Sequence, residues 1–394
     1  MRSILTILGI VIGIAAIILV QAVGSGARDL ILNQIRGLGS KTIVVEPGRE
    51  PKGPSDFTSI FLDSLKEKDY KSLIEQSASL GVTNIMPIVF APVPMTVGGE
   101  TKTVNVIGTT DSIERVLGLY PDEGSFFGED ENLSRASVVL IGSEVKKDLF
   151  GDGDALGQKI RIKNRNYLVV GAFSSKGQVG FFNMDEAAIV PHTTAMEYIT
   201  GKNYYNEFIL EAEDEKNVEQ TKQNIIAALR DLHGIDDPEK DDFHVMSQED
   251  IVKRVDMITG ILSALLVSVA AVSLIVGGVG IMNIMLVSVT ERTREIGLRK
   301  ALGATEKNIL SQFIFEAVLL TATGGAIGVS LGAFLAFVTS LILSKVVSQN
   351  WVFSFPIDAA LTGLAVSSLV GLVFGFYPAR QAAKKNPIEA LRYE

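Results

Sequence analysis

Long apolar runs alternate with one long polar segment along the chain. Four runs carry no formal charge and are long enough to cross a bilayer core, which takes about 20 helical residues. The first run is longer than the roughly 7–15 apolar residues of a signal peptide and lacks a small-x-small cleavage site, so we interpret it as a retained membrane helix. The four runs cover residues 4–23, 257–290, 317–343 and 359–379.

The second run is too long for a simple span. At 1.5 Å per residue, a helix over residues 257–290 would reach about 50 Å, against about 30 Å of hydrocarbon. Upstream, Ser247 and Asp250 have capping-box spacing, which predicts one helix from residue 248 to residue 290. The stretch ARDLILNQI within residues 24–40 predicts a continuation of the first span. Two membrane helices would then extend outward as a stalk; two short interfacial helices are the alternative.

The polar segment between the first two spans predicts an α+β domain. Its order of strand and helix patterns indicates a split ferredoxin-like module over residues 41–110 and 204–247. Between the two parts lies an insertion, residues 111–203, whose short strand patterns predict a mostly β subdomain. The strand patterns are KTIVVEP, TKTVNVIG, NEFILEAE and DFHVMS in the module and SVVLIG, QKIRIKN and NYLVVGAF in the insertion; helix patterns cover residues 62–77 and 218–232.

Prolines interrupt one further strand pattern, at residues 85–97. Proline cannot donate a hydrogen bond to a neighbouring strand, so prolines are confined to edge strands, strand starts and bulges. Because Pro87, Pro92 and Pro94 all fall in this pattern, we expect any strand here to be bent or at a sheet edge.

Lysine and arginine placement predicts the orientation in the membrane. The segment 291–310 and the tail 380–394 are basic, whereas the short loop 344–358 holds only Lys345. We therefore expect both termini and the 291–310 segment in the cytoplasm. The loop 344–358 and the domain between the first two spans are then extracytoplasmic.

No pattern in the chain predicts an enzyme. The absence of cysteine excludes disulfides, thiol nucleophiles and thiolate metal sites, and the three histidines lack ligand spacing. The segment GDGDALGQK, residues 151–159, meets neither the phosphate-loop nor the calcium-loop pattern and is interpreted as a turn between a helix and a strand. We expect no catalytic residue, no bound cofactor, no metal and no nucleic-acid partner. The acidic pairs Asp236-Asp237 and Asp241-Asp242 are expected to face solvent.

The membrane segments hold few polar side chains. Gln21 and Asn283 are the only strongly polar candidates within the spans, and no charged residue lies mid-span. A proton- or ion-coupled transporter usually carries such a charge, so any energy source is expected elsewhere. Glycines four residues apart predict close helix packing, at Gly9 and Gly13, Gly328 and Gly332, and Gly371 and Gly375.

The basic segment after the second span has the pattern of a short surface helix. On a helical wheel, Arg292, Arg299 and Lys300 share one arc, with Ile296 between them. Leu298, Ala301 and Leu302 share another arc. We expect the apolar arc to face the membrane, the basic arc to face outward, Gly303 to end the helix and Thr305 to cap the next one. This pattern fits a lipid anchor or a docking point for a cytoplasmic protein, and it slightly favours the anchor because basic surface helices commonly bind lipid.

Several segments closely resemble one family. ERTREIGLRKALGATEKNILSQFIFEAVLL resembles the signature loop of MacB/FtsX-type ABC transporter permeases. The first span SILTILGIVIGIAAIILV, the segment SEVKKDLFGDGDALGQKIRIKNRNYLVVGAF and the tail FYPARQAAKKNPIEALRYE are similar to the same family in the same order. The resemblance is closer to the MacB branch than to the division-associated FtsX branch.

The resemblance implies a non-catalytic permease subunit of an ABC exporter in a bacterial inner membrane. Family members form dimers, and each subunit engages a cytoplasmic ATPase, which uses ATP and Mg²⁺. Closure of the ATPases moves the long helices and the outer domain, whose two parts resemble the porter and sabre parts of MacB, and the substrate is expelled. A periplasmic adaptor and membrane lipid are further expected partners. Residues 291–304 resemble the coupling helix, in which the matching positions are Glu295, Gly297, Arg299, Lys300, Ala301, Gly303 and Ala304.

The chain also departs from the MacB pattern. No Walker motif occurs and three residues precede the first span, so we expect the ATPase to be a separate chain or to have been lost from this one. Two alternatives stay open. One is an FtsX-like signalling scaffold that activates an extracytoplasmic partner, and the other is a lipoprotein-extraction permease.

Overall fold

The computed structural model divides the chain into two compact units. Unit 1 comprises residues 1–31 and 255–394, and unit 2 comprises residues 32–254. The structure describes residues 2–37, 39–49, 63–179, 182–346, 353 and 355–391. Residues 347–352 and 354 of the expected loop at 344–358 and the last three residues of the tail lie outside the described residues.

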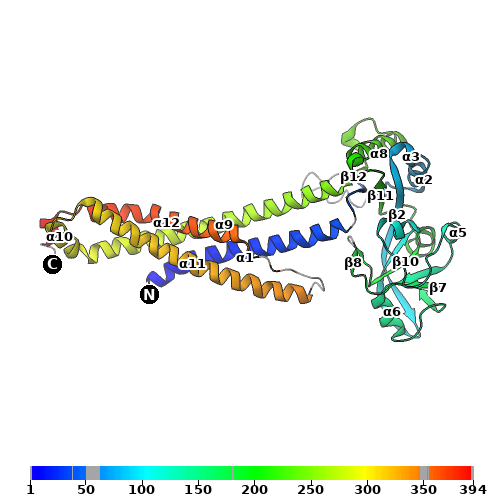
Figure 1. Cartoon of the computed structure of the whole chain (residues 1–394), viewed down its shortest axis with the longest axis horizontal. Helices are drawn as coiled ribbons and strands as arrows, with labels where there is room; N and C mark the ends of the chain where they lie inside the picture. The colour runs from blue at the N-terminus through cyan, green and yellow to red at the C-terminus, as the bar shows by residue number, and fades with distance from the viewer. Residues whose placement is uncertain are drawn as a thin grey trace. The chain divides into compact units, whose positions relative to one another are not determined.

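Unit 1 is helical. Four helices in the described residues are long and apolar enough to cross a membrane, and they include the four runs expected from the sequence (Figure 1). Three of them, α1 with 35 residues, α9 with 44 and α11 with 41, far exceed the length that a simple span needs. Two short helices complete the unit. The helices are α1 (Arg2–Arg36), α9 (Gln248–Glu291), α10 (Thr293–Ala301), α11 (Glu306–Val346), α12 (Ile357–Ala383) and α13 (Pro387–Leu391).

Close backbone approach holds the long helices of unit 1 together. A Cβ atom added to Gly332 on α11 would lie 2.9 Å from Ala15 Cα on α1, and one added to Gly371 on α12 would lie 2.9 Å from the Ala317 carbonyl oxygen on α11. The pairs Gly328/Gly332 and Gly371/Gly375 lie at such close contacts, which confirms their predicted role, whereas a Cβ atom on Gly9 or Gly13 would meet α9 at an ordinary 3.5 Å. The apolar core between the helices includes Ile10, Ile14, Ile18, Leu274, Ile281, Met285 and Phe313.

The start of α9 has the reciprocal bonds of a capping box. The Asp250 amide donates to Ser247 Oγ at 3.2 Å, and the Ser247 amide donates to Asp250 Oδ2 at 3.0 Å. The helix therefore begins at Gln248, as the sequence predicts, and continues without a break to Glu291. Farther along, the Arg28 side chain of α1 pairs with Asp256 of α9 at 2.5 Å within unit 1.

The first part of unit 2 is a ferredoxin-like module. Its strands lie in the order β12-β1-β11-β2, which is the 4-1-3-2 order of two interleaved βαβ units. Helices α2, α3 and α8 gather beside these strands (Figure 1). Leu73, Ile225 and Leu229 from the helices join the same buried cluster as Val45 and Phe208 from the strands. The elements are β1 (Thr42–Pro47), α2 (Glu67–Glu75), α3 (Ser77–Leu80), β2 (Val82–Val97), β11 (Glu207–Ala212), η3 (Glu215–Asn217), α8 (Val218–His233), η4 (Pro238–Lys240) and β12 (Phe243–Ser247).

The second part of unit 2 is a closed barrel. Pairing runs from β2 through β3, β10, β5 and β7 to β6, and β6 pairs again with β2. A predicted mostly β insertion is thereby confirmed. The barrel also takes in β3 and the second half of β2, which lie before residue 111. Its elements are β3 (Glu100–Thr109), α4 (Ser112–Val116), β4 (Glu123–Gly124), α5 (Glu129–Leu133), β5 (Val138–Ile141), α6 (Ser143–Phe150), β6 (Lys159–Ile162), β7 (Arg165–Ala172), β8 (Gln178–Val179), β9 (Phe182–Asn183), β10 (Ala187–Pro191), α7 (His192–Thr194) and η2 (Ala195–Thr200).

Strand β2 belongs to both parts of unit 2. Its first half pairs with β11 up to Ile88, and its second half pairs with β3 from Val89 onward. The expectation of a bent or edge strand is confirmed at the prolines, whereas Met95 and Thr96 farther along β2 have β3 on one flank and β6 on the other. The three prolines are tolerated because each pairs with a strand on one flank alone: Pro87 with β11, and Pro92 and Pro94 with β3.

The GDGDALGQK segment joins α6 to β6, so its interpretation as a helix-to-strand turn is confirmed. The Leu156 amide donates to Asp154 Oδ1 at 3.0 Å, which is the local bond that favours aspartate in turns. The expectation that Asp241 and Asp242 face solvent is wrong. Asp241 accepts two hydrogen bonds from Arg230, at 2.6 and 2.8 Å, and Asp242 lies 2.6 Å from His233 Nδ1.

Candidate functional site

The candidate coupling segment forms helix α10 and the turn that follows it. After the helix ends at Ala301, Gly303 takes a φ of 103°, a left-handed conformation that glycine adopts without strain. The Gly303 amide donates to the Lys300 carbonyl at 3.1 Å, and the Ala304 amide donates to the Arg299 carbonyl at 3.0 Å. This is a Schellman motif, so the predicted role of Gly303 in ending the helix is confirmed.

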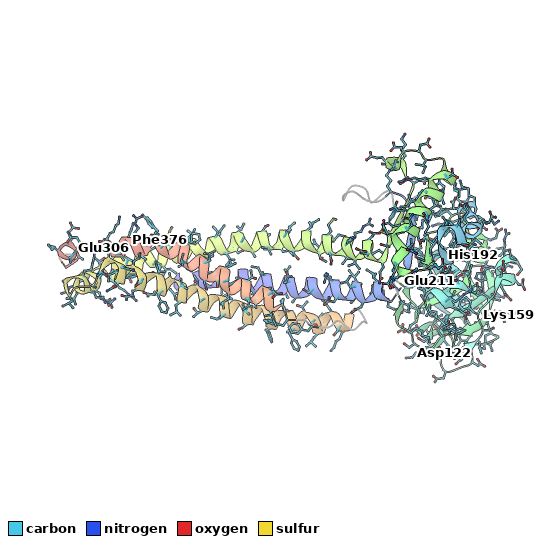
Figure 2. The ribbon with its side chains drawn as sticks, turned by 45° about the horizontal axis from the view of Figure 1, so that its top comes forward. Asp122, Lys159, His192, Glu211, Glu306 and Phe376 are labelled. Atoms are coloured by element: carbon cyan, nitrogen blue, oxygen red, sulfur yellow. The ribbon has the colours of Figure 1, made fainter. Side chains whose placement is uncertain are left out.

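The next helix starts directly after that turn. The Asn308 amide donates to Thr305 Oγ1 at 3.3 Å, and the Ile309 amide donates to the Thr305 carbonyl at 3.2 Å. Thr305 therefore caps α11, as the sequence predicts. Glu306, the first residue of α11, is marked in Figure 2. Its carboxylate lies 4.0 Å from Lys300 Nζ, which brings the two ends of the turn together.

Helix α10 packs against the short helix α13. Ile296 is 1% exposed, and a Cβ atom added to Gly297 would lie 2.7 Å from Ala390 Cβ of α13. A larger residue at position 297 would therefore push α13 away. Thr293 is also buried, and its Oγ1 donates to the Val289 carbonyl at 3.0 Å, which continues the packed face back to α9.

Lys300 anchors α10 to the end of α12. Its Nζ donates to the Ala383 carbonyl at 2.6 Å and to the Lys385 carbonyl at 2.9 Å, and its side chain is 11% exposed. The carbonyls at a helix C-terminus carry the negative end of the helix dipole, so an ammonium group there is favourable. The predicted outward basic arc is wrong for this residue. The lysine faces inward because unpaired helix-end carbonyls lie within its reach.

Arg299 stays on the surface of unit 1. Its guanidinium pairs with Glu295 at 2.5 Å, one turn earlier on α10, and donates to Gln312 Oε1 of α11 at 2.9 Å. Arg292 reaches α11 as well, where it lies 3.3 Å from Glu316. These exposed contacts brace the short helix against α11, although each exposed ion pair is worth only about 0–1 kcal/mol.

Four of the seven matched residues form two groups of contacts. Gly297 and Lys300 contact the C-terminal segment, and Glu295 and Arg299 form the brace toward α11. Ala301 and Gly303 are exposed, whereas Ala304 is half-buried and packs against the helix core. The structure therefore brings these residues into one compact joint of α10, α11, α12 and α13.

The predicted apolar arc of Leu298, Ala301 and Leu302 is exposed on this chain. Leu298 is 53% exposed and Leu302 is 81% exposed, and on α13 Ile388 is 76% exposed. Sequence reasoning missed α13 entirely. A signal for it exists at Asn386-Pro387, because asparagine caps helices and proline favours their first position. The Ile388 amide donates to Asn386 Oδ1 at 3.1 Å.

Nothing in the joint forms a reactive centre. Within the described ranges no group of three or more histidine, aspartate or glutamate side chains has metal-binding geometry. Asn283, expected to bond between helices, lies exposed on α9. The site offers a braced apolar surface, and this arrangement suits docking of another molecule.

Comparison with known proteins agrees with this architecture. A model described as MacB-like periplasmic core domain matches residues 3–228, and one described as FtsX-like permease C-terminal matches residues 267–387. The chain belongs to the MacB/FtsX-like permease family. The second match contains the whole of α10, and the first contains the ferredoxin-like module up to α8 and the complete barrel.

Curated relatives in this family are macrolide export ATP-binding/permease proteins named MacB. The protein from Bdellovibrio bacteriovorus is 36% identical over 394 residues, and the one from Neisseria gonorrhoeae is 37% identical over 396 residues. The chain is matched over 100% and 99% of its length, but it spans only 59% and 58% of theirs. The matched region is thus the permease part of the MacB relatives.

One solved structure with a similar fold is the periplasmic region of MacB from Actinobacillus actinomycetemcomitans. It is 24% identical, has a TM-score of 0.49, and covers 58% of this chain and 98% of its own. The family assignment and the four long apolar helices make this chain a membrane protein with a domain of the MacB periplasmic type.

Proposed function

We propose that this chain is the permease subunit of an ABC exporter that works by mechanotransmission. Helix α10 and its surroundings receive the movement of an ATPase carried on a separate chain. The observation that carries the proposal is the contrast within one short helix. Gly297 and Lys300 fix α10 to the rest of unit 1, while Leu298 and Leu302 remain uncovered by this chain. A firmly held helix with free apolar residues is suited to insert into a groove of a partner.

Helix α9 is the proposed transmitter. It is continuous over 44 residues from Gln248 to Glu291, and the single residue Arg292 separates it from α10. A helix without an internal break passes a displacement of one end to the other more faithfully than a flexible linker. Movement of α10 is therefore expected to reach the domain of the periplasmic type, which expels the substrate without passing it through a membrane channel.

The remaining parts of the assembly follow from this role. We infer a homodimer in a bacterial inner membrane, with α10 and both termini in the cytoplasm. The partner ATPase binds and hydrolyses ATP with Mg²⁺, and this chain contributes no catalytic residue. A periplasmic adaptor would receive the substrate outside. The name of the curated relatives supports export over a signalling scaffold or a lipoprotein-extraction permease, as does the match of the MacB-like periplasmic core domain.

Leu302 offers a direct test, because its high exposure makes a polar substitution harmless to folding. The full chain is reconstituted in lipid nanodiscs with a candidate ATPase, and binding and ATP hydrolysis are measured with and without macrolides, peptides and lipoproteins. Leu302→Glu is expected to weaken ATPase binding by roughly tenfold or more, as for a central interface residue. The matched control is Leu133→Glu, at a leucine of unit 2 that is 74% exposed.

Full binding and coupled hydrolysis in Leu302→Glu would contradict the docking role of α10. Hydrolysis that responds to an extracytoplasmic protein, but to no transported compound, would favour the signalling alternative. Stimulation by lipoproteins alone would favour extraction from the membrane.

A further inference from the structure

Unit 2 contains a cavity of about 660 Å³ that plays no part in the proposed coupling. This volume lies within the range of small-molecule sites, which is about 300–1,000 Å³. Its walls come from β1, β2, β3, β9, β10 and the segment that leads into β11. Apolar and aromatic side chains predominate at one end, among them Phe90, Ile107, Phe182 and Tyr204.

Two glutamates lie side by side in this wall. Antiparallel pairing of β1 with β11 runs to Val45 opposite Phe208, and the next pair in the same register is Glu46 opposite Glu207. Side chains of directly opposed residues share one face of a sheet, and like charges in such a pair repel. Both glutamates line the cavity, so it carries two adjacent carboxylates on its sheet-facing wall.

The two carboxylates differ in their partners. Glu46 lies 2.9 Å from His244 Nε2, on the neighbouring strand β12. Among the described residues, no lysine, arginine or histidine lies within ion-pair distance of Glu207, which is half-buried on β11. Burial, together with the neighbouring charge of Glu46, raises the pKa of Glu207 to about 8. A cation entering the cavity would relieve both effects.

Among the described residues, Lys202 is the one cationic side chain that lines the cavity. Its ammonium lies 5.0 Å from the centre of the Tyr204 ring, a cation–π distance, and the residue is exposed. It is thus engaged with an aromatic ring at the solvent side and does not form an ion pair with Glu207. Phe90 also lines the cavity and is 48% exposed, so its ring offers apolar surface to a ligand.

We propose that this cavity binds an organic cation with an apolar body, with Glu207 as the charge partner and Phe90 and Tyr204 as the surfaces that contact the body. Carboxylates beside aromatic rings recognise ammonium groups by charge and by cation–π attraction. If the proposed export function holds, such a cation belongs to the substrate class. Binding is measured without ATP or an ATPase, so the two proposals fail independently.

The test uses the full chain in lipid nanodiscs. Equilibrium dialysis measures binding of (1-naphthylmethyl)trimethylammonium, whose charge does not titrate, against 1-naphthalenemethanol and 1-naphthoate, with empty nanodiscs as the background. The intact chain is expected to prefer the cation. Glu207→Gln is expected to weaken cation binding by about tenfold and to leave binding of the neutral alcohol unchanged.

Matched variants separate this role from general charge. Glu211→Gln removes a carboxylate from the same strand, at a residue labelled in Figure 2. Glu211 bonds Asn84 at 2.7 Å and is not among the residues that line the cavity, so cation binding should be unchanged. Phe90→Ala should weaken binding of both cation and alcohol. Equal cation binding by Glu207→Gln and the intact chain would overturn the proposal. Preferred binding of naphthoate that is lost in Lys202→Met would also overturn it, in favour of an anion site.

Discussion

The ammonium of Lys300 bonds the carbonyl oxygen of Ala383, 83 residues later in the chain, at 2.6 Å. This contact joins the candidate coupling helix to the end of α12. It turns the basic segment after the second long helix into a structural joint, in which one lysine serves the fold and its neighbour Arg299 stays at the surface.

Removing that ammonium is expected to loosen the joint. Lys300→Met keeps the length of the buried chain but removes two charge-assisted hydrogen bonds to carbonyls of the C-terminal segment. We expect a loss of about 2 kcal/mol in the stability of unit 1. Thermal unfolding in detergent measures this loss, and Lys307→Met, at an exposed lysine on α11, is the control. Equal melting temperatures of the two variants would mean that the contact adds nothing to stability.

Substitution of Gly371 by a larger residue is expected to disrupt the packing of α11 against α12 in unit 1. A Cβ atom there would lie 2.2 Å from Thr321 Oγ1 and 2.9 Å from the Ala317 carbonyl oxygen, so α11 and α12 would have to separate. Gly371→Leu should cost roughly 3 kcal/mol or more, at or above the upper end for overpacked cores. The control is Gly260→Leu on α9, where a Cβ atom meets nothing within 4 Å. That change should be neutral or slightly stabilising, since glycine disfavours helices by about 1 kcal/mol.

His233 should make unit 2 more stable in mild acid. The Asp69 carboxylate, 3.1 Å from Nε2, is the main cause that raises the pKa of His233, and Asp242, 2.6 Å from Nδ1, adds to it. The other charged groups around this histidine are Asp63, Lys66 and Lys68. A raised pKa in the folded state stabilises below the unfolded value of about 6.5, and this contribution is lost as pH rises through the folded value.

Chemical unfolding of the full chain at about pH 6 and about pH 8 measures the effect. The intact chain should lose stability between the two, and His233→Gln should lose less. Asn224→Asp, elsewhere on α8, is the control and should keep the full difference. An identical pH difference in His233→Gln and in the intact chain would contradict the assignment.

Glu207 should lower the stability of unit 2 at high pH. Its pKa is raised from 4.5 to about 8 in the folded state, so the folded chain binds the proton more tightly than the unfolded chain between these values. Stability then falls as pH rises from about 4.5 to about 8. At about pH 9, Glu207→Gln should raise the free energy of unfolding by roughly 1–2 kcal/mol, less than a fully buried group would give. The difference should vanish at about pH 4, and a constant difference across pH would point to packing instead.

Periodic and capped elements were predictable from the sequence. Ser247 and Asp250 fixed the start of α9, Gly303 fixed the end of α10, and the glycine pairs identified the helix contacts, because each depends on local backbone geometry. These signals need no knowledge of distant residues. The family resemblance then indicated how these elements follow one another in a permease.

Features that depend on distant pairing were missed. The inward turn of Lys300 depends on carbonyls 83 and 85 residues away, and the opposition of Glu46 and Glu207 depends on the register of β1 with β11. The pairing of Met95 and Thr96 on both flanks was missed because it depends on the distant strand β6. Helix α13 was missed because five residues give too short a pattern.

The two strands joined to α1 and α9 are direct neighbours in unit 2. Ile43 pairs with Ser247 at the ends of β1 and β12 nearest the two helices, and Gln248 Nε2 donates to the Ile35 carbonyl at 3.1 Å beside this pair. A force that pulled α1 and α9 apart would break the β1–β12 pairs one after another, from Ile43 toward Pro47. A force that drew both helices in the same direction would leave the ladder intact. Joint motion of α1 and α9 therefore leaves unit 2 intact, whereas their separation would first break the pairing at Ile43 and Ser247.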